Sequence, residues 1–88
     1  MREAEGKIFV DIDVDVCDRS VVPGCPAAAP GGISAFELRQ AARILAGHPK
    51  VRGIDITEID ASADSADQRT VKLGALLVLE IAAGFQYR

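Results

Sequence analysis

The chain begins its ordered pattern with a short apolar run that continues as a strict alternation of acidic and branched aliphatic residues. Residues 8–10 read Ile-Phe-Val, and residues 11–16 read Asp-Ile-Asp-Val-Asp-Val. A period of two is typical of an extended strand, in which alternate side chains share one face. The pattern therefore predicts a strand from about Lys7 to Val16, with three aspartates on one face and aliphatic residues on the other.

Downstream, the pattern predicts a helix and a second strand. Ser34 and Glu37 form a capping box, in which each side chain satisfies a free backbone amide at a helix start. Apolar residues then recur at roughly helical spacing until Gly47 and Pro49, which end the helix. Residues 51–59 are rich in β-branched side chains and predict the second strand.

The last part of the chain predicts a second helix. Residues 70–83 are apolar on almost every side, with Lys72 and Glu80 as the polar exceptions, so we expect this helix to be buried. Asp67 stands where an N-cap would be, and Gly84 where a C-cap would be.

The order strand, helix, strand, helix predicts an α/β unit with parallel strands and a right-handed crossover. Parallel sheets normally have both faces covered and a neighbour at each edge, which two strands cannot provide for themselves. On its own, the chain is therefore expected to form a homo-oligomer through the sheet edge or the apolar final helix.

Three aspartates on one strand face need a chemical explanation. Asp11, Asp13 and Asp15 would lie ~6.5–7 Å apart, and an unpaired charge on a covered face costs several kcal/mol. A hard divalent cation would remove that cost. A loop rich in Pro and Gly follows at the carboxyl end of the strand, where parallel strands usually meet ligand. The alternative is an acidic sheet edge in water, which discourages aggregation.

Two other aspartate patterns fit poorly. An EF-hand loop starting at Asp11 would need Gly at its sixth position and Glu at its twelfth, where this chain has Val16 and Val22. A phosphatase with Asp13 as nucleophile and Asp15 as acid/base remains a weaker alternative, because the chain is too short for the core and cap of that fold. Its other roles would fall to Thr57, Lys72 and Glu58.

The order of these motifs resembles the ureohydrolases, the family of arginase, agmatinase and formimidoylglutamase. An Asp-x-Asp strand, a Pro-Gly step, a Gly-Gly-Ile-Ser step, a strand-end Glu and a closing helix carry the resemblance. They lie at residues 10–18, 23–24, 31–34, 37–38, 53–60, 64, 67, 69–70 and 76–80. The resemblance implies that residues 1–88 are a single C-terminal fragment, the β-α-β-α portion of the three-layer arginase-like fold with its parallel sheet.

The resemblance also implies a site. Asp13 matches the bridging ligand of a centre of two Mn²⁺ ions, and Asp15 matches a ligand of one ion. In such a centre the ions lower the pKa of a bridging water, and the resulting hydroxide attacks a guanidinium or formimidoyl carbon. Glu58 matches the acid that orients the amidino group of the small-molecule substrate through charge-assisted hydrogen bonds.

Other parts of the family's site do not occur in this chain. The Gly-Gly-Asp-His and Asp-Ala-His-x-Asp segments that supply the remaining ligands are absent, and the only histidine, His48, falls in an expected surface loop. We therefore expect the chain to need the N-terminal remainder of a parent enzyme as its partner, and to be inactive alone. The interpretation left open beside this one is a non-catalytic assembly or regulatory module that retains the closing half of the fold.

The substrate is suggested by the loop after the Pro-Gly step. Residues 25–30 read Cys-Pro-Ala-Ala-Ala-Pro, where arginases and agmatinases usually have Thr-Gly-Thr-Pro-Glu. This departure favours a formimidoylglutamase, which hydrolyses N-formimidoyl-glutamate to glutamate and formamide.

The composition limits which partners and which cellular location are expected. A net charge of -3 with dispersed arginines argues against nucleic acid as a partner. The apolar stretch 73–79 is far shorter than the ~20 residues that cross a membrane. No signal-peptide pattern is present, and Cys17 and Cys25 fit no zinc spacing, so we expect a cytoplasmic protein with reduced thiols. A hydrophobic content of 49% and a mean hydropathy of +0.17 in so short a chain suggest surface meant for other elements.

Overall fold

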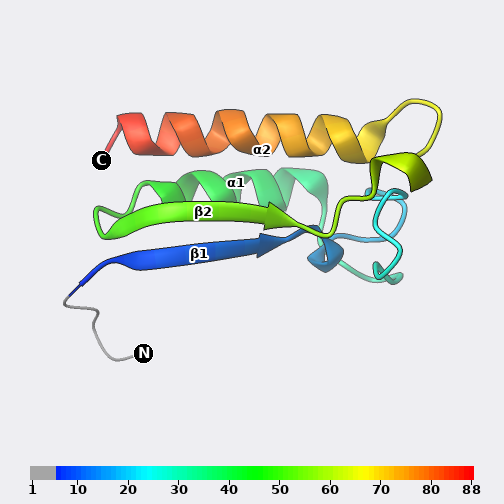
Figure 1. Ribbon diagram of the computed structural model, residues 1–88, viewed down its shortest axis with the longest axis horizontal. Helices are drawn as coiled ribbons and strands as arrows, with labels where there is room; N and C mark the ends of the chain where they lie inside the picture. Colours follow the sequence, from blue (N-terminus) through cyan, green and yellow to red (C-terminus); the bar gives the residue numbers. More distant parts are fainter. Residues whose placement is uncertain (1–5) are drawn as a thin grey trace.

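The computed structural model describes residues 6–88 as a two-stranded parallel sheet with two helices. This arrangement confirms the predicted α/β class. In chain order the elements are β1 (Ile8–Asp13), the 3₁₀ turn η1 (Val14–Val16), α1 (Ala35–Ala46), β2 (Val51–Thr57), the 3₁₀ turn η2 (Ala61–Ala63) and α2 (Arg69–Gln86) (Figure 1).

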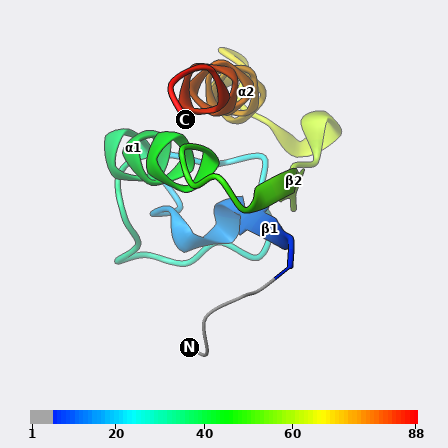
Figure 2. The same ribbon diagram turned by 90° about the vertical axis from the view of Figure 1, so that its left-hand side faces the viewer.

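Both helices lie on the same side of the sheet (Figure 2). The alternation of the strands explains this arrangement, because their aliphatic positions face the helices and pack on the core. These residues are Val10, Ile12, Ile54 and Ile56. The core continues into α1 through Leu38 and Ala42, and into α2 through Leu73 and Leu77.

The loop between β1 and α1 also contributes to the core. Cys17, Val22 and Cys25 are all fully buried in it, although it contains no helix or strand after η1. The Asp18 carboxylate closes the loop, accepting the Gly31 amide at 2.7 Å. Hydrogen bonds from Ser20 and Gly31 lower the pKa of Asp18 to about 2. This loop is therefore a packed part of the fold.

The first strand is shorter than predicted, because it ends at Asp13 and not at Val16. The Asp13 side chain accepts the Asp15 amide at 3.0 Å and so caps the turn η1. This turn buries Val14 completely. The prediction of three aspartates on one strand face was thus wrong for Asp15, since a local side-chain hydrogen bond competes successfully with the strand.

The start of α1 confirms the predicted capping box. The Glu37 amide donates to the Ser34 hydroxyl at 3.1 Å, and the Ser34 amide donates to the Glu37 carboxylate at 2.9 Å. Gly47 is the C-cap, as expected from the sequence.

Both predicted ends of α2 were wrong. The N-cap position is Gln68, which makes no side-chain capping bond. Asp64 accepts the amides of Thr70 and Val71, and Asp67, one residue before the N-cap, accepts the Arg69 amide at 3.2 Å. Gly84 lies inside the helix, which continues to Gln86. A Cβ on Gly84 would lie 2.5 Å from the Arg43 carbonyl oxygen and 2.7 Å from the Ala46 Cβ. This glycine therefore serves close helix packing and not helix termination.

An ionic cluster joins the two helices beside this contact. Glu80 of α2 accepts the Arg39 Nε at 2.9 Å and the Arg43 Nε at 2.8 Å, with its own side chain only 12% exposed. Hydrogen bonds and charge from Arg43 and Arg39 lower the pKa of Glu80. Glu80, a polar residue in an otherwise apolar stretch of α2, thus connects the two helices.

The burial predicted for α2 holds for one face only. Leu73 and Leu77 are buried, but Val78 is 57% exposed and Leu79 is 65% exposed. Homo-oligomer formation through this face stays a prediction. Within residues 6–88, no helix has the length and apolar character needed to cross a membrane.

The glycine contact between the helices can be tested by a matched pair of variants. Gly84→Ala should lower the free energy of unfolding by about 1–3 kcal/mol, because backbone atoms block the added methyl group. Gly74→Ala is the control, since its new Cβ would meet only the movable Ile59 Cδ1 at 3.0 Å, and it should gain from helix propensity. Urea titration of both variants measures the difference; equal effects would contradict the packing role of Gly84.

Candidate functional site

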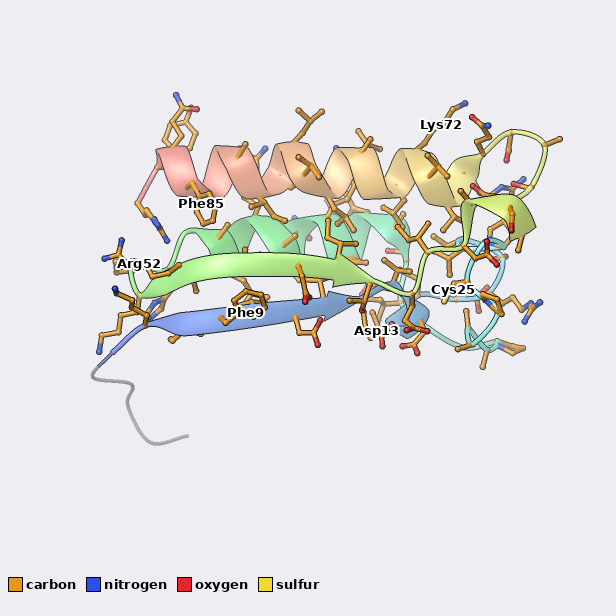
Figure 3. The ribbon with its side chains drawn as sticks, in the orientation of Figure 1. Phe9, Asp13, Cys25, Arg52, Lys72 and Phe85 are labelled. Atoms are coloured by element: carbon orange, nitrogen blue, oxygen red, sulfur yellow. The ribbon has the colours of Figure 1, made fainter. Side chains whose placement is uncertain are left out.

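The three residues predicted for the site lie at the same end of the sheet. Asp13 is the last residue of β1, and its register partner on β2 is Thr57. Asp15 belongs to the turn that follows β1, and Glu58 directly follows β2. Figure 3 shows Asp13 at the carboxyl end of its strand, away from Phe9 and Arg52. Parallel strands commonly bind ligands at this end of a sheet.

Asp13 and Asp15 form a half-buried carboxyl pair. The Asp15 backbone amide donates to the Asp13 carboxylate at 3.0 Å, and both side chains are only partly exposed. Partial desolvation raises the pKa of Asp15, and the charge and hydrogen bond of Asp13 raise it further. Two carboxylates held this closely repel each other when both are ionised, and a bound cation would relieve that repulsion.

The donor chemistry of this pair fits a hard cation. Carboxylate oxygens are ligands that Mn²⁺ and Mg²⁺ accept readily. However, the part of the chain that the structure describes brings together no group of three or more potential ligands from His, Cys, Asp and Glu. Asp13 and Asp15 therefore fit one portion of a metal site, whose other ligands would have to come from elsewhere.

Glu58 has an unusual backbone. Its φ of 74° lies in the left-handed region, which side chains other than glycine seldom adopt. Such a conformation costs on the order of 1–3 kcal/mol and occurs often at functional sites. The strand predicted to reach residue 59 therefore ends at Thr57, and the exposed Glu58 begins an irregular segment that leads to η2. No local feature of the sequence predicts this backbone conformation.

A second carboxyl pair, which sequence reasoning missed, lies one step back along the strands. Asp11 and Asp55 are register partners on β1 and β2, and both are exposed. A side-chain hydrogen bond to Asp11 raises the pKa of Asp55, and desolvation and the charge of Asp11 add to the effect. The sequence shows an aspartate on each predicted strand, but only the register of the two strands shows that these aspartates are neighbours.

The histidine and the cysteines take no part in this arrangement. His48 is exposed in the turn between α1 and β2, and its Nδ1 accepts the Lys50 amide at 3.1 Å. Cys17 and Cys25 are both buried with free thiols. Burial raises the pKa of Cys17, with smaller contributions from Cys25 and Glu37. These thiols are thus part of the packed loop.

Comparison with known proteins decides the family. The model of the arginase family matches residues 1–84. The chain belongs to the arginase family.

Individual relatives agree with this assignment. The chain is 40% identical over 79 residues to the formimidoylglutamase of Bacillus subtilis, an alignment that covers 90% of this chain and 24% of that enzyme. The crystal structure of the Bacillus subtilis enzyme superimposes with a TM-score of 0.85 over 91% of this chain and 25% of the other. The mitochondrial arginase 1 of Arabidopsis thaliana is 35% identical over 77 residues, which cover 86% of this chain and 22% of the arginase.

A more distant structure supports the fold. The formiminoglutamase of Trypanosoma cruzi, crystallised with Mn²⁺, is 24% identical and superimposes with a TM-score of 0.86, covering 96% of this chain and 28% of the other. This chain of the arginase family therefore spans about a quarter of the length of the relatives that it matches.

The second carboxyl pair predicts an unusual pH dependence. Because the pKa of Asp55 is raised above its ordinary 3.8, its contribution to stability is present below that value and is lost as the pH rises through the folded pKa. Asp55→Asn should therefore reduce the loss of stability between pH 3.8 and neutrality. Unfolding titrations across this range measure the change.

Asp67 provides a control of opposite sign. Hydrogen bonds from Arg69 and Ser65 lower the pKa of Asp67 to about 2, so its contribution is present above pH 3.8 and is lost on acidification. Asp67→Asn should weaken the fold at neutral pH. Parallel pH profiles for Asp55→Asn and Asp67→Asn would contradict the assignment.

Proposed function

We propose that this chain is the C-terminal part of a formimidoylglutamase-like ureohydrolase, to which it contributes metal ligands and a substrate-binding carboxylate. The observation that carries the proposal is the convergence of Asp13, Asp15 and Glu58 at the carboxyl end of adjacent parallel strands, in a member of the arginase family. The proposed reaction is hydrolysis of a formimidoyl or guanidino C–N bond.

Asp13 and Asp15 are the proposed metal ligands. Their paired carboxylates offer hard oxygen donors whose mutual repulsion a cation would relieve. The structure of the Trypanosoma cruzi formiminoglutamase with Mn²⁺ supports manganese as the metal. When bound, two such ions lower the pKa of water enough to supply hydroxide near neutral pH.

Glu58 is the proposed substrate-binding residue. A planar amidinium group presents N–H donors, and an ionised carboxylate accepts them in short, charge-assisted hydrogen bonds. The left-handed backbone at Glu58 sets the direction in which its side chain leaves the chain at the end of β2. Similarity to the Bacillus subtilis enzyme and the Pro-Ala-rich loop at residues 25–30 favour N-formimidoyl-glutamate as the substrate.

The remaining ligands would come from an N-terminal remainder of the parent enzyme. This division explains why residues 6–88 contain an incomplete ligand set in a chain that spans 24% of its Bacillus subtilis relative. Alone, the chain should hydrolyse nothing. A non-catalytic assembly module is the competing outcome of the experiment below.

The length of the natural polypeptide is the first test. We expect the reading frame to continue upstream of Met1 and to encode the Gly-Gly-Asp-His and Asp-Ala-His-x-Asp segments, because the ligand set is incomplete without them. Sequencing the upstream DNA and measuring the intact mass of the protein from its native source will show this. A natural chain that starts at Met1 and contains neither segment would favour the assembly module.

Two substitutions in the complete polypeptide separate metal binding from substrate binding. Asp13→Asn should lose Mn²⁺ and turnover together, because a ligand has been removed. Glu58→Gln should keep its Mn²⁺ but lose about tenfold to hundredfold in kcat/KM, the value of a charge-assisted hydrogen bond of roughly 1.5–3 kcal/mol. Metal analysis and assays with N-formimidoyl-glutamate measure both quantities.

The control for this pair is His48→Gln, which changes an exposed side chain outside the site and should alter neither metal content nor turnover. Full metal content and unchanged turnover in Asp13→Asn would refute the proposed function.

A further inference from the structure

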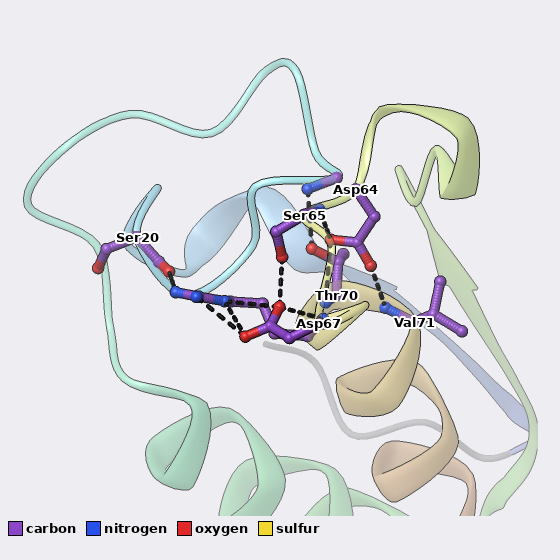
Figure 4. A network of polar contacts seen from close by, with 8 residues as sticks. Ser20, Asp64, Ser65, Asp67, Thr70 and Val71 are labelled. Carbon is purple, nitrogen blue, oxygen red and sulfur yellow. Dashed lines mark hydrogen bonds and ion pairs between the residues drawn. The ribbon is translucent and has the colours of Figure 1, made fainter.

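The core contains a polar side chain that the proposed function does not yet use. Thr70, in the first turn of α2, is the one fully buried polar side chain in the described part of the chain. Its hydroxyl oxygen accepts the Gly24 amide at 2.8 Å, and its backbone amide donates to the Asp64 carboxylate at 3.3 Å. Figure 4 shows Thr70 beside Asp64 at the start of α2.

Gly24 carries this interaction onward to the segment that follows β2. Its carbonyl oxygen accepts the Asp60 amide at 2.7 Å. A Cβ at Gly24 would lie 3.0 Å from the Asp60 carbonyl oxygen and 3.1 Å from the Thr70 Cβ, so glycine fits this gap where a larger residue would crowd it. A continuous series of hydrogen bonds thus runs from Asp64 through Thr70 and Gly24 to Asp60.

Glu58 lies two residues before the end of that series. Its left-handed backbone can persist only where the residues around it are firmly held. On one side, Thr57 is fixed in the β-ladder opposite Asp13. On the other side, Asp60 is fixed by Gly24, and the side chain of Ile59 packs against α2 at Gly74.

The contacts of α2 with Gly24 and Ile59 come from one face of the helix. Thr70 and Gly74 are four residues apart and are therefore neighbours on the helix surface. Gly24, in turn, belongs to the loop that follows β1 and η1, and so is continuous with the segment that carries Asp13 and Asp15. Thr70 accordingly joins the loop that follows β1 and η1 to the segment that follows β2.

We propose that Thr70 is a positioning residue, whose buried hydroxyl fixes the backbone of Glu58 relative to Asp13 and Asp15 through Gly24 and Asp60. This inference rests on the proposed role of Glu58 in substrate binding. It assigns Thr70 no contact with the substrate or the metal. Its effect on catalysis should pass through Glu58.

Thr70→Val is the informative variant, because valine keeps the shape of the side chain and removes the hydroxyl. In the complete polypeptide, kcat/KM for N-formimidoyl-glutamate should fall about tenfold to hundredfold, the size expected for a misplacement of roughly 1 Å. The Mn²⁺ content should stay at the wild-type value. Thr70→Ser keeps the hydroxyl and should restore kcat/KM to near the wild-type value.

A double-mutant cycle with Glu58→Gln distinguishes positioning from general damage. If Thr70 acts through Glu58, adding Thr70→Val to Glu58→Gln should cause little further loss, because the group being positioned has already lost its charge. Losses that multiply, or wild-type kinetics in Thr70→Val, would overturn the inference. Wild-type kinetics in Glu58→Gln would instead refute the proposed role of Glu58, so the two failures are separable.

A measurement on the unmodified polypeptide covers the case in which Thr70→Val does not fold. Because its acceptor is buried, the Gly24 amide should exchange its hydrogen as slowly as the interior amides of α2. Exchange at the rate of an exposed loop would show that the bond to Thr70 does not hold Gly24, and would overturn the inference.

Discussion

The parallel pairing of β1 and β2 is the constraint on which the rest of the molecule depends. It places Asp13 opposite Thr57, so that residues more than forty positions apart in sequence meet at one sheet end. The same pairing turns the aliphatic positions of both strands toward the helices and leaves Asp11 beside Asp55. The core and the acidic groups are therefore two consequences of one register.

The capping of η1 by Asp13 then shapes the site locally. Had β1 continued, Asp15 would stand two residues further along the strand, ~6.5–7 Å away. The turn instead brings its carboxyl group to that of Asp13, while Val14 anchors the turn in the core. Asp13 is thus both the residue that ends the strand and one half of the carboxyl pair.

Sequence patterns predicted the features of the fold that depend on residues close together in the chain. The period of two identified β1, and the Ser34–Glu37 capping box located the start of α1. The prediction that Gly84 ends α2 was wrong because the local sequence around a glycine does not show whether it terminates a helix or allows a second helix to pack closely. The left-handed backbone of Glu58 and the buried bond of Thr70 to Gly24 depend on contacts across the fold. Asp13 was a candidate cation ligand from the alternation of acidic and aliphatic residues alone, whereas Glu58 was accessible from sequence only through family resemblance.

The described structure contains two unfavourable features at the sheet end, namely the repulsion within the Asp13–Asp15 pair and the backbone strain at Glu58. Neither improves the packing of the core. The buried side chain of Val14 anchors the turn that carries Asp15, and the hydroxyl of Thr70 is proposed to hold the segment that follows Glu58. A fold selected for stability alone would gain by replacing Asp15 or by placing glycine at Glu58. Conflicts of this kind concentrate where a protein performs chemistry. Their position at the carboxyl ends of both strands is therefore independent physical support for a site at this end of the sheet.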